Sequence, residues 1–327
     1  MKSEILRLLK ESDDYISGQQ MCDRFHVSRT AVWKAIEQLK KEGYEIEAVR
    51  NRGYRLLESP DIMSEAEIRS LMDTEWAGKN IVYFDEIDST NNRAKELGEK
   101  DGAHGTLFVA DRQVAGKGRR GRVWESPKGI SIYMTILLRP DLIPTKAPML
   151  TLVMAQSVAE GIREVTGMET GIKWPNDIVM NKKKVCGILT EMSTEIDYIN
   201  YVVIGVGINV NQKVFDEELK EKATSLMIET GAPVKRSALI AAVMKHFEKN
   251  YALFMENGDL SGLQESYNEM LVNRGKEVRI LEPGNEYNAH AYGINETGEL
   301  IVRTQKGEEK HIFAGEVSVS IKEYQKV

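Results

Sequence analysis

Hydrophobic residues recur at helical spacing through the first forty positions of the chain, which predicts a compact helical module. An amphipathic helix is expected over residues 5–9. Ser17 and Gln20 form a capping box, which predicts the start of a second helix. Ser28 is placed to cap a third helix, whose apolar positions would face the core of the module. Those positions are Val32, Ile36 and Leu39.

A β-hairpin is predicted directly after these helices. Strands 44–49 and 54–57 flank Asn51 and Gly53, which tolerate the positive φ of a tight turn. Three helices followed by a hairpin are typical of a winged helix-turn-helix, which reads DNA with its third helix. The alternative is a helical module that mediates protein contacts. The residues expected at DNA are Ser28, Arg29, Thr30, Trp33, Lys34, Arg50 and Arg52.

The rest of the chain mixes strand and helix patterns, and several strands follow one another without a helix between them. This order favours an α+β fold with a mixed sheet over a doubly wound fold. We predict domains at 1–58, 64–270 and 271–327, with a linker near residues 57–61. The last domain has four short strand patterns separated by turns, including one at 282–285, and is expected to form a small β-barrel.

The predicted elements of the central domain are strands 81–84, 106–110, 130–138, 178–180, 185–192 and 201–210, with helices 91–99, 146–165, 237–256 and 260–270. The predicted C-terminal strands are 277–281, 288–293, 300–304 and 310–313.

Charge is unevenly distributed along the chain. The 327 residues carry a net charge of −6, yet residues 24–55 contain eight basic and four acidic side chains. Nucleic-acid phosphates attract such a cationic patch. No apolar run is long enough for a membrane span, and the N-terminus has no signal-like apolar core. Two distant cysteines and five scattered histidines suggest no metal cluster, so we expect a cytoplasmic protein.

Residues 116–122 alternate glycines with four cations, a composition that favours binding of a phosphate-bearing small ligand, with a mobile basic loop as the alternative. A dinucleotide-binding loop is excluded because Pro127 and Gly129 prevent a helix from following it. A P-loop is excluded because Gly121 is not followed by Lys-Ser or Lys-Thr. A nucleic-acid arm is disfavoured because the loop lies inside a folded domain and leads into an apolar strand.

Four other segments carry candidate chemistry. Residues 173–177 form a Lys-Trp-Pro-Asn-Asp turn, whose Asp177 carboxylate could hold Mg²⁺ against a triphosphate. Lys184 adjoins a buried strand, where we expect a bound anion to be its partner. Glycines in segment 205–209 would let a flat apolar ligand lie on the sheet. Segment 88–92 places hydroxyl and amide groups at a helix N-terminus, where they can hold a polar ligand head. Taken singly, the turn, the glycines and the cap each have ordinary structural explanations.

Taken together and in this order, these segments resemble biotin protein ligases over essentially the whole chain. With the N-terminal module, the chain resembles the type that is both biotin ligase and biotin-operon repressor. The resemblance implies that ATP and biotin form biotinyl-5′-AMP and that a lysine of a biotin carboxyl carrier domain then accepts the biotin. It also implies a homodimer that binds operator DNA, and an SH3-like C-terminal domain. The alternatives are a ligand-sensing transcription factor without catalysis, and a ligase whose N-terminal module no longer binds DNA.

The resemblance also implies roles for individual residues. Lys184 and Arg119 would be catalytic, and Asp177 would contact Mg²⁺. Lys117 stands where the family's loop often carries Arg, and Cys186 stands where a small residue is usual. The implied biotin-binding residues are Ser89, Thr90, Asn91, Gln113, Gly116, Lys117, Gly118, Arg119, Lys184, Gly187, Gly205 and Gly207. The implied nucleotide-binding residues are Arg119, Arg120, Arg122, Trp124, Asn176, Asp177 and Asn209.

Overall fold

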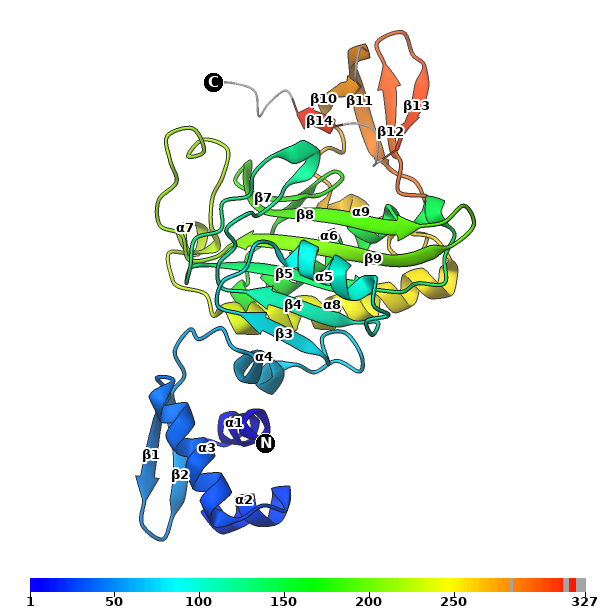
Figure 1. Cartoon of the computed structure of the whole chain (residues 1–327). Helices are drawn as coiled ribbons and strands as arrows, with labels where there is room; N and C mark the ends of the chain where they lie inside the picture. Colours follow the sequence, from blue (N-terminus) through cyan, green and yellow to red (C-terminus); the bar gives the residue numbers. More distant parts are fainter. Residues whose placement is uncertain (283–284, 314–317, 322–327) are drawn as a thin grey trace. The chain divides into compact units, whose positions relative to one another are not determined.

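The computed structural model describes residues 1–282, 285–313 and 318–321 (Figure 1). The chain forms two compact units. The first contains residues 1–73 and 235–241, and the second contains residues 74–234 and the described residues from 242 onward. None of the helices in these described ranges is long and apolar enough to cross a membrane.

The first unit contains the predicted three helices and hairpin. The Ser17–Gln20 capping box is confirmed in both directions, and the Ser28 side chain accepts a hydrogen bond from the Ala31 backbone. In the hairpin turn Gly53 has a φ of 117°, and a Cβ there would lie 2.1 Å from the Ile16 carbonyl oxygen. The elements are α1 (Lys2–Glu11), α2 (Gly18–Phe25), α3 (Arg29–Lys41), β1 (Glu45–Val49), β2 (Gly53–Glu58) and α4 (Glu65–Leu71).

Helix α4 packs on α1 within this first unit. The Arg7 guanidinium donates to the Ser70 carbonyl at 3.1 Å, near the C-terminus of α4. Glu67, only 3% exposed, accepts hydrogen bonds from Lys10 and Tyr44, each at 2.5 Å. The helix that the sequence assigns to the second domain therefore groups with the first unit, while the three domain boundaries stay predictions.

A seven-stranded sheet forms the centre of the second unit, in the order β3-β4-β5-β9-β8-β7-β6. Among its described pairs β3 and β4 are parallel and the others are antiparallel, so the predicted mixed sheet is confirmed. The sequence did not predict β6. The strands are β3 (Ile81–Phe84), β4 (Thr106–Ala110), β5 (Ser131–Leu138), β6 (Gly171–Lys173), β7 (Asp177–Met180), β8 (Lys183–Thr194) and β9 (Ile199–Asn209).

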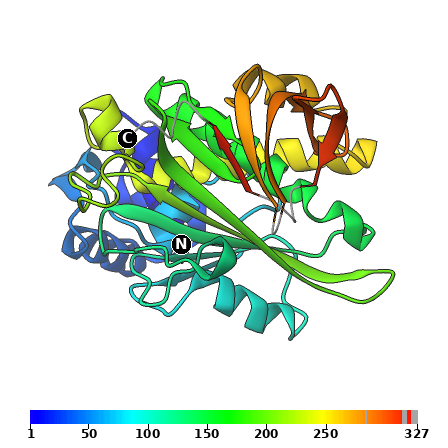
Figure 2. The same cartoon turned by 90° about the horizontal axis from the view of Figure 1, so that it is seen from above.

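Helices cover both faces of this sheet. Helix α5 lies on one face, and α6 and most of α8 lie on the other (Figure 2). Thirteen of the eighteen residues of α6 are buried, which is expected of a helix that is apolar on nearly all sides. The helices are α5 (Thr90–Gly98), α6 (Met149–Thr166), α7 (Leu226–Thr230), α8 (Arg236–Asn257) and α9 (Gln264–Met270), with 3₁₀ turns at Arg119–Gly121 and Pro144–Lys146.

The C-terminal strands form a separate antiparallel sheet in the order β13-β12-β11-β10-β14, which agrees with the predicted small β domain. Trp174 connects this sheet to the central one, since its indole N–H donates to the Gly298 carbonyl at 3.0 Å. The predicted 282–285 turn lies partly outside the described residues. The strands are β10 (Glu277–Glu282), β11 (Asn285–Ile294), β12 (Leu300–Thr304), β13 (Glu309–Ile312) and β14 (Ser318–Ile321).

Candidate active site and DNA-binding surface

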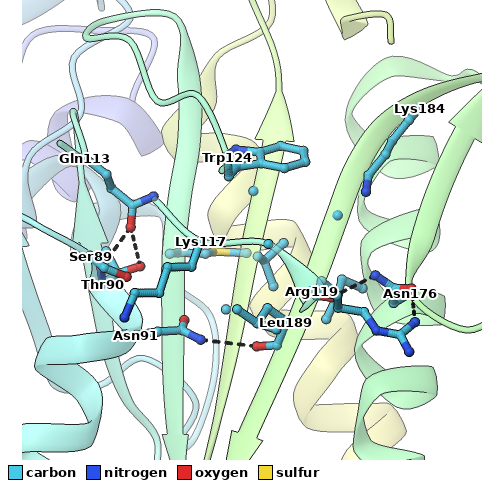
Figure 3. Close-up of a pocket in the computed structure, with 17 residues that line it drawn as sticks. Ser89, Thr90, Asn91, Gln113, Lys117, Arg119, Trp124, Asn176, Lys184 and Leu189 are labelled. Carbon is cyan, nitrogen blue, oxygen red and sulfur yellow. Dashed lines mark hydrogen bonds between the residues drawn. The ribbon is translucent and has the colours of Figure 1, made fainter. Parts of the chain in front are cut away.

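Neutral polar side chains line one end of a cavity of about 50 Å³ between α5 and the sheet (Figure 3). The Gln113 carbonyl oxygen accepts hydrogen bonds from the Thr90 backbone at 2.8 Å and from the Thr90 hydroxyl at 3.1 Å. Ser89 lines the same end. Thr135, buried in β5, lies behind it with its hydroxyl 2.8 Å from that of Thr90. Ser89, Thr90 and Gln113 thus offer hydrogen bonds without formal charge, and the Lys117 side chain lies beside them.

The side-chain amide of Asn91 is engaged by the protein itself. Its nitrogen donates to the Leu189 carbonyl at 3.3 Å and to Glu191 at 2.8 Å, and its oxygen accepts from the Thr135 hydroxyl at 2.6 Å. Burial raises the pKa of Glu191, but hydrogen bonds from Lys95 and Asn91 outweigh it and leave that pKa lowered. Asn91 therefore lines the predicted cavity with its hydrogen bonds already formed.

The predicted glycines line the cavity, and the indole ring of Trp124 packs against Gly187 and Gly207. Gly187 and Gly207 face each other in neighbouring strands. A Cβ on Gly207 would lie 2.6 Å from the Trp124 ring, and one on Gly187 would lie 2.9 Å from it. A Cβ on Gly205 would lie 2.1 Å from the Asn91 side chain. None of these positions has room for a side chain.

The glycine- and cation-rich loop closes on itself. The Gly118 backbone donates to the Arg122 carbonyl at 2.7 Å, and Trp124 donates to the Gly116 carbonyl at 3.0 Å. Gly116 does not line the cavity, unlike the other predicted biotin-binding residues. It supports the loop instead, since a Cβ there would lie 2.4 Å from the Trp124 carbonyl oxygen. The Lys117 ammonium donates to Asn92 at 3.0 Å.

Arg119 connects this loop to the Lys-Trp-Pro-Asn-Asp turn. Its guanidinium donates to the Asn176 side-chain oxygen at 2.7 Å, and the Asn176 amide donates to the Ile188 carbonyl at 3.1 Å. Burial lowers the pKa of Arg119, and the Asp177 carboxylate opposes that shift. The two motifs, more than fifty residues apart in sequence, therefore form one wall of the site.

Lys184 contacts a carboxylate of the protein. Its ammonium lies 2.6 Å from Asp177 and 5.3 Å from the centre of the Trp124 ring. Its partner in this structure is therefore Asp177, which corrects the expectation that a bound anion would be the partner. Burial lowers the pKa of the neighbouring Lys173, and Lys184 and Arg122 add to that shift, which Asp177 opposes. Lys184, Lys173 and Arg119 all interact with this one carboxylate. Positive charge is therefore in excess, and the region is suited to binding an anion.

A second cavity of about 650 Å³ extends from this cationic region. All seven predicted nucleotide-binding residues line it, together with Lys173 and Leu281. Loop residues 212–223 form another wall and are held to β8, because the Lys184 backbone donates to the Lys222 carbonyl at 2.8 Å. The sequence reasoning missed this loop. Its signal was a few apolar residues, among them Phe215 and Leu219, within a highly charged segment.

Two further residues singled out in the sequence are Asp177, the predicted Mg²⁺ contact, and Cys186. Within the described ranges no three His, Cys, Asp or Glu side chains gather as metal ligands, so Asp177 as a Mg²⁺ contact stays a prediction. Cys186 is fully buried in β8, and burial raises the pKa of its thiol. A buried thiol that stays protonated is chemically inert and packs as a small apolar side chain.

The first unit presents the predicted DNA-binding residues at its surface. Trp33 is 53% exposed and so lies outside the core. The Arg29 guanidinium donates to the Gln19 side chain at 2.8 Å, while the Arg52 guanidinium stacks 4.2 Å from the Tyr15 ring. Ser28, Thr30, Lys34 and Arg50 are exposed as well. This arrangement matches a recognition helix beside a basic wing.

Comparison with known proteins agrees with this geometry. Residues 83–209 match the biotin/lipoate A/B protein ligase family, residues 2–55 match a helix-turn-helix domain, and residues 275–320 match the biotin protein ligase C-terminal domain. The chain is 43% identical over 324 residues to a Bacillus spizizenii protein named bifunctional ligase/repressor BirA, covering 98% of each chain. It is 28% identical to the Escherichia coli protein of that name, covering 95% of each.

A solved structure shares the fold of about three quarters of the chain. Biotin protein ligase from Aquifex aeolicus, in complex with biotin and ATP, is 34% identical and has a TM-score of 0.66, covering 74% of this chain and 99% of that chain. The identity, the matched domains and the shared architecture lead to one conclusion. This chain belongs to the biotin protein ligase family, in its bifunctional ligase and repressor class.

Proposed function

We propose that this chain condenses biotin with ATP to form biotinyl-5′-AMP and pyrophosphate, and then transfers biotin to a lysine of a biotin carboxyl carrier domain. The observation that supports this proposal is the change of polarity along the site. Uncharged hydrogen-bonding groups stand at one end, glycines in contact with the Trp124 ring lie in the middle, and a cationic region opens into the 650 Å³ cavity. That order suits a neutral ureido head, an apolar body and a carboxylate beside a triphosphate.

The head of biotin would bind at the uncharged end. Ser89, Thr90 and Gln113, which line this end of the cavity, would exchange hydrogen bonds with the ureido group. Gly118 and Arg119 would contact the carboxylate and the α-phosphate. Binding at the head fixes the position of the carboxylate, and such positioning supplies much of the acceleration in a reaction between two bound substrates.

In the first step, an oxygen of the biotin carboxylate attacks the α-phosphorus of ATP. The bond to the β-phosphate breaks, and pyrophosphate leaves with the electron pair. Lys184 would stabilise the negative charge that develops between carboxylate and phosphate, and Trp124 would stack on the ligand. Asn176 and Asn209 belong to the nucleotide side of the site.

Mg²⁺ is proposed to arrive with the triphosphate. A single carboxylate, that of Asp177, suits an ion that keeps phosphate and water oxygens as its other ligands. The ion would neutralise phosphate charge. Cys22 and Cys186 are free thiols, as is usual in a reducing compartment, and we propose that the reaction takes place in the cytoplasm.

The ligase proposal is tested by incubating the protein with labelled biotin, ATP, Mg²⁺ and a carrier domain. We expect label on the carrier and a biotin-dependent exchange of pyrophosphate into ATP. A carrier whose acceptor lysine is replaced by arginine is the matched control and should stay unlabelled. Absence of both exchange and carrier labelling would contradict the proposal.

We further propose that biotinyl-5′-AMP promotes a homodimer that represses transcription by binding an inverted-repeat operator. A ligand can shift this equilibrium only by binding the dimer more tightly than the monomer. The exposed Arg29 and Lys34 on α3 support DNA binding. A gel-shift assay with and without biotin plus ATP tests this proposal. A shift that requires biotin in a protein lacking pyrophosphate exchange would favour a sensor without catalysis.

A further inference from the structure

A third cavity, of about 310 Å³, adjoins the two cavities described above. Its walls come from the start of α6, from β8 and from the Pro175–Asn176 turn. Arg119 and Asn176, hydrogen-bonded at 2.7 Å, line all three cavities. The vitamin and the nucleotide account for two of them. The third shares the wall at which the reactive carbonyl would form.

We propose that this third cavity admits the aminobutyl side chain of the acceptor lysine. The inference rests on the proposed function, in which the lysine amine must reach the acyl carbon of biotinyl-5′-AMP. A lysine side chain has an apolar stem and a polar tip. The walls offer both kinds of contact, with apolar surface from Pro148, Ile188 and Met192.

Two hydroxyl groups stand among these apolar walls. Thr151 of α6 and Thr190 of β8 have their side-chain oxygens 2.7 Å apart. When one hydroxyl donates to the other, lone pairs remain on both oxygens, and an amine N–H can donate to them. Thr151 is only 9% exposed, whereas Met192 is 46% exposed. The hydroxyl pair therefore lies deeper than Met192, at the depth expected for the tip of an inserted side chain.

The charges beside the cavity favour the reactive form of lysine. Two cationic residues, Arg119 and Arg120, line its wall. A nearby like charge disfavours an ammonium ion, so it lowers the pKa of the entering lysine and raises the fraction that is a neutral amine. Only the neutral amine has a lone pair with which to attack.

The transfer step forms one bond at the acyl carbon and breaks another. The amine nitrogen attacks the acyl carbon of biotinyl-5′-AMP and forms a C–N bond. The bond from that carbon to the phosphate oxygen breaks, and AMP leaves with the electron pair. The nitrogen loses one proton to water as the amide forms, in addition to the proton that the ammonium ion gave up on entry.

Partial reactions test this assignment. Met192→Trp should narrow the cavity at its exposed side, and Thr190→Val should remove one hydroxyl with little change of shape. Thr194→Trp is the matched control, because Thr194 is exposed on the same strand and does not line the cavity. Each full-length variant is assayed for pyrophosphate exchange, for single-turnover transfer from preformed biotinyl-5′-AMP to a carrier domain, and for release of biotin hydroxamate by hydroxylamine.

We expect Met192→Trp to slow transfer to the carrier about tenfold or more and Thr190→Val to slow it severalfold, the scale of loss for a mispositioned reactant. Exchange should stay near wild type in all three variants, and Thr194→Trp should transfer normally. In Met192→Trp, the rate of hydroxamate formation should fall less than the rate of transfer to the carrier, because hydroxylamine is a small molecule. Unchanged transfer in both cavity variants, or equal losses of exchange and transfer, would overturn the assignment. Absence of exchange in the wild-type protein would instead contradict the proposed function itself.

Discussion

The Lys184 ammonium, which lines both ligand cavities, lies 2.6 Å from the Asp177 carboxylate and is therefore paired within the protein. The two side chains are 33% and 22% exposed, so solvent weakens their attraction. A carboxylate or phosphate of the substrates can therefore compete for Lys184. The pair keeps the ammonium in place before the ligands bind.

Lys184→Ala is expected to lower adenylation roughly 100-fold or more, because a preorganised cation that stabilises developing charge is lost. Biotin-dependent pyrophosphate exchange measures the effect. Lys182→Asn is the matched control, since Lys182 is exposed in the adjacent turn with a positive φ that asparagine tolerates. Exchange at the wild-type rate in Lys184→Ala would contradict the assigned role.

Arg119→Gly is expected to release biotinyl-5′-AMP and to label bystander lysines. The substitution removes the 2.7 Å hydrogen bond to Asn176 and adds glycine freedom to a loop that we also predict to be ordered by ligand. Labelling of an unrelated protein in the reaction mixture measures the leak. Arg112→Ala is the control, because the exposed Arg112 pairs with Glu86 and lines none of the three cavities. Equal bystander labelling in wild type and Arg119→Gly would count against this prediction.

Gly207→Ala is expected to weaken biotin binding about tenfold or more. The new methyl group would lie 2.6 Å from the Trp124 ring, so either the indole or the strand backbone at residue 207 has to move. Calorimetric titration with biotin measures affinity, and the melting temperature shows whether the variant is folded. A folded variant with wild-type affinity would show that ligand does not lie on this glycine.

The stability of the second unit should depend on the protonation of His246. Its imidazole lies 3.3 Å from Glu160 and 2.8 Å from Glu164, and the hydrogen bond to Glu160 raises its pKa. A raised pKa in the folded state means that this contribution is fully present below the pKa of an unfolded histidine. It is lost as pH rises through the folded value.

Urea unfolding between about pH 5.5 and 8.5 measures this dependence. The free energy of unfolding of wild type should fall more steeply over that range than that of His246→Gln. Identical slopes would show that the histidine is not coupled to folding in this way.

Two arginines of the first unit should affect DNA binding differently. Arg29→Ala, on α3, should relax the preference for an operator selected from a random duplex pool, because base-edge contacts specify sequence. Arg50→Ala, on the wing, should weaken operator and random duplexes alike and reduce the salt slope by about one, as loss of a phosphate contact does. Fluorescence anisotropy at several salt concentrations separates the two effects. Equal loss of preference in both variants would contradict the assigned contacts.

The sequence by itself determined the elements that depend on neighbours along the chain. The Ser17 capping box, the hairpin at Gly53, and the ranges of β3 and β4 follow from short-range periodicity and backbone preference, and the structure confirms them. The glycine- and cation-rich loop and the Lys-Trp-Pro-Asn-Asp turn were recognisable because their side-chain chemistry is unusual wherever it occurs.

Only the tertiary structure decided which of these segments meet. Strand register brings Gly187 opposite Gly207 beneath Trp124, and sheet packing places Thr135 behind Thr90. Packing of α4 on α1, which the Glu67 contacts stabilise, assigns that helix to the first unit. These relationships join residues tens of positions apart. They depend on how whole faces of helices and strands pack, which no local pattern in the sequence specifies.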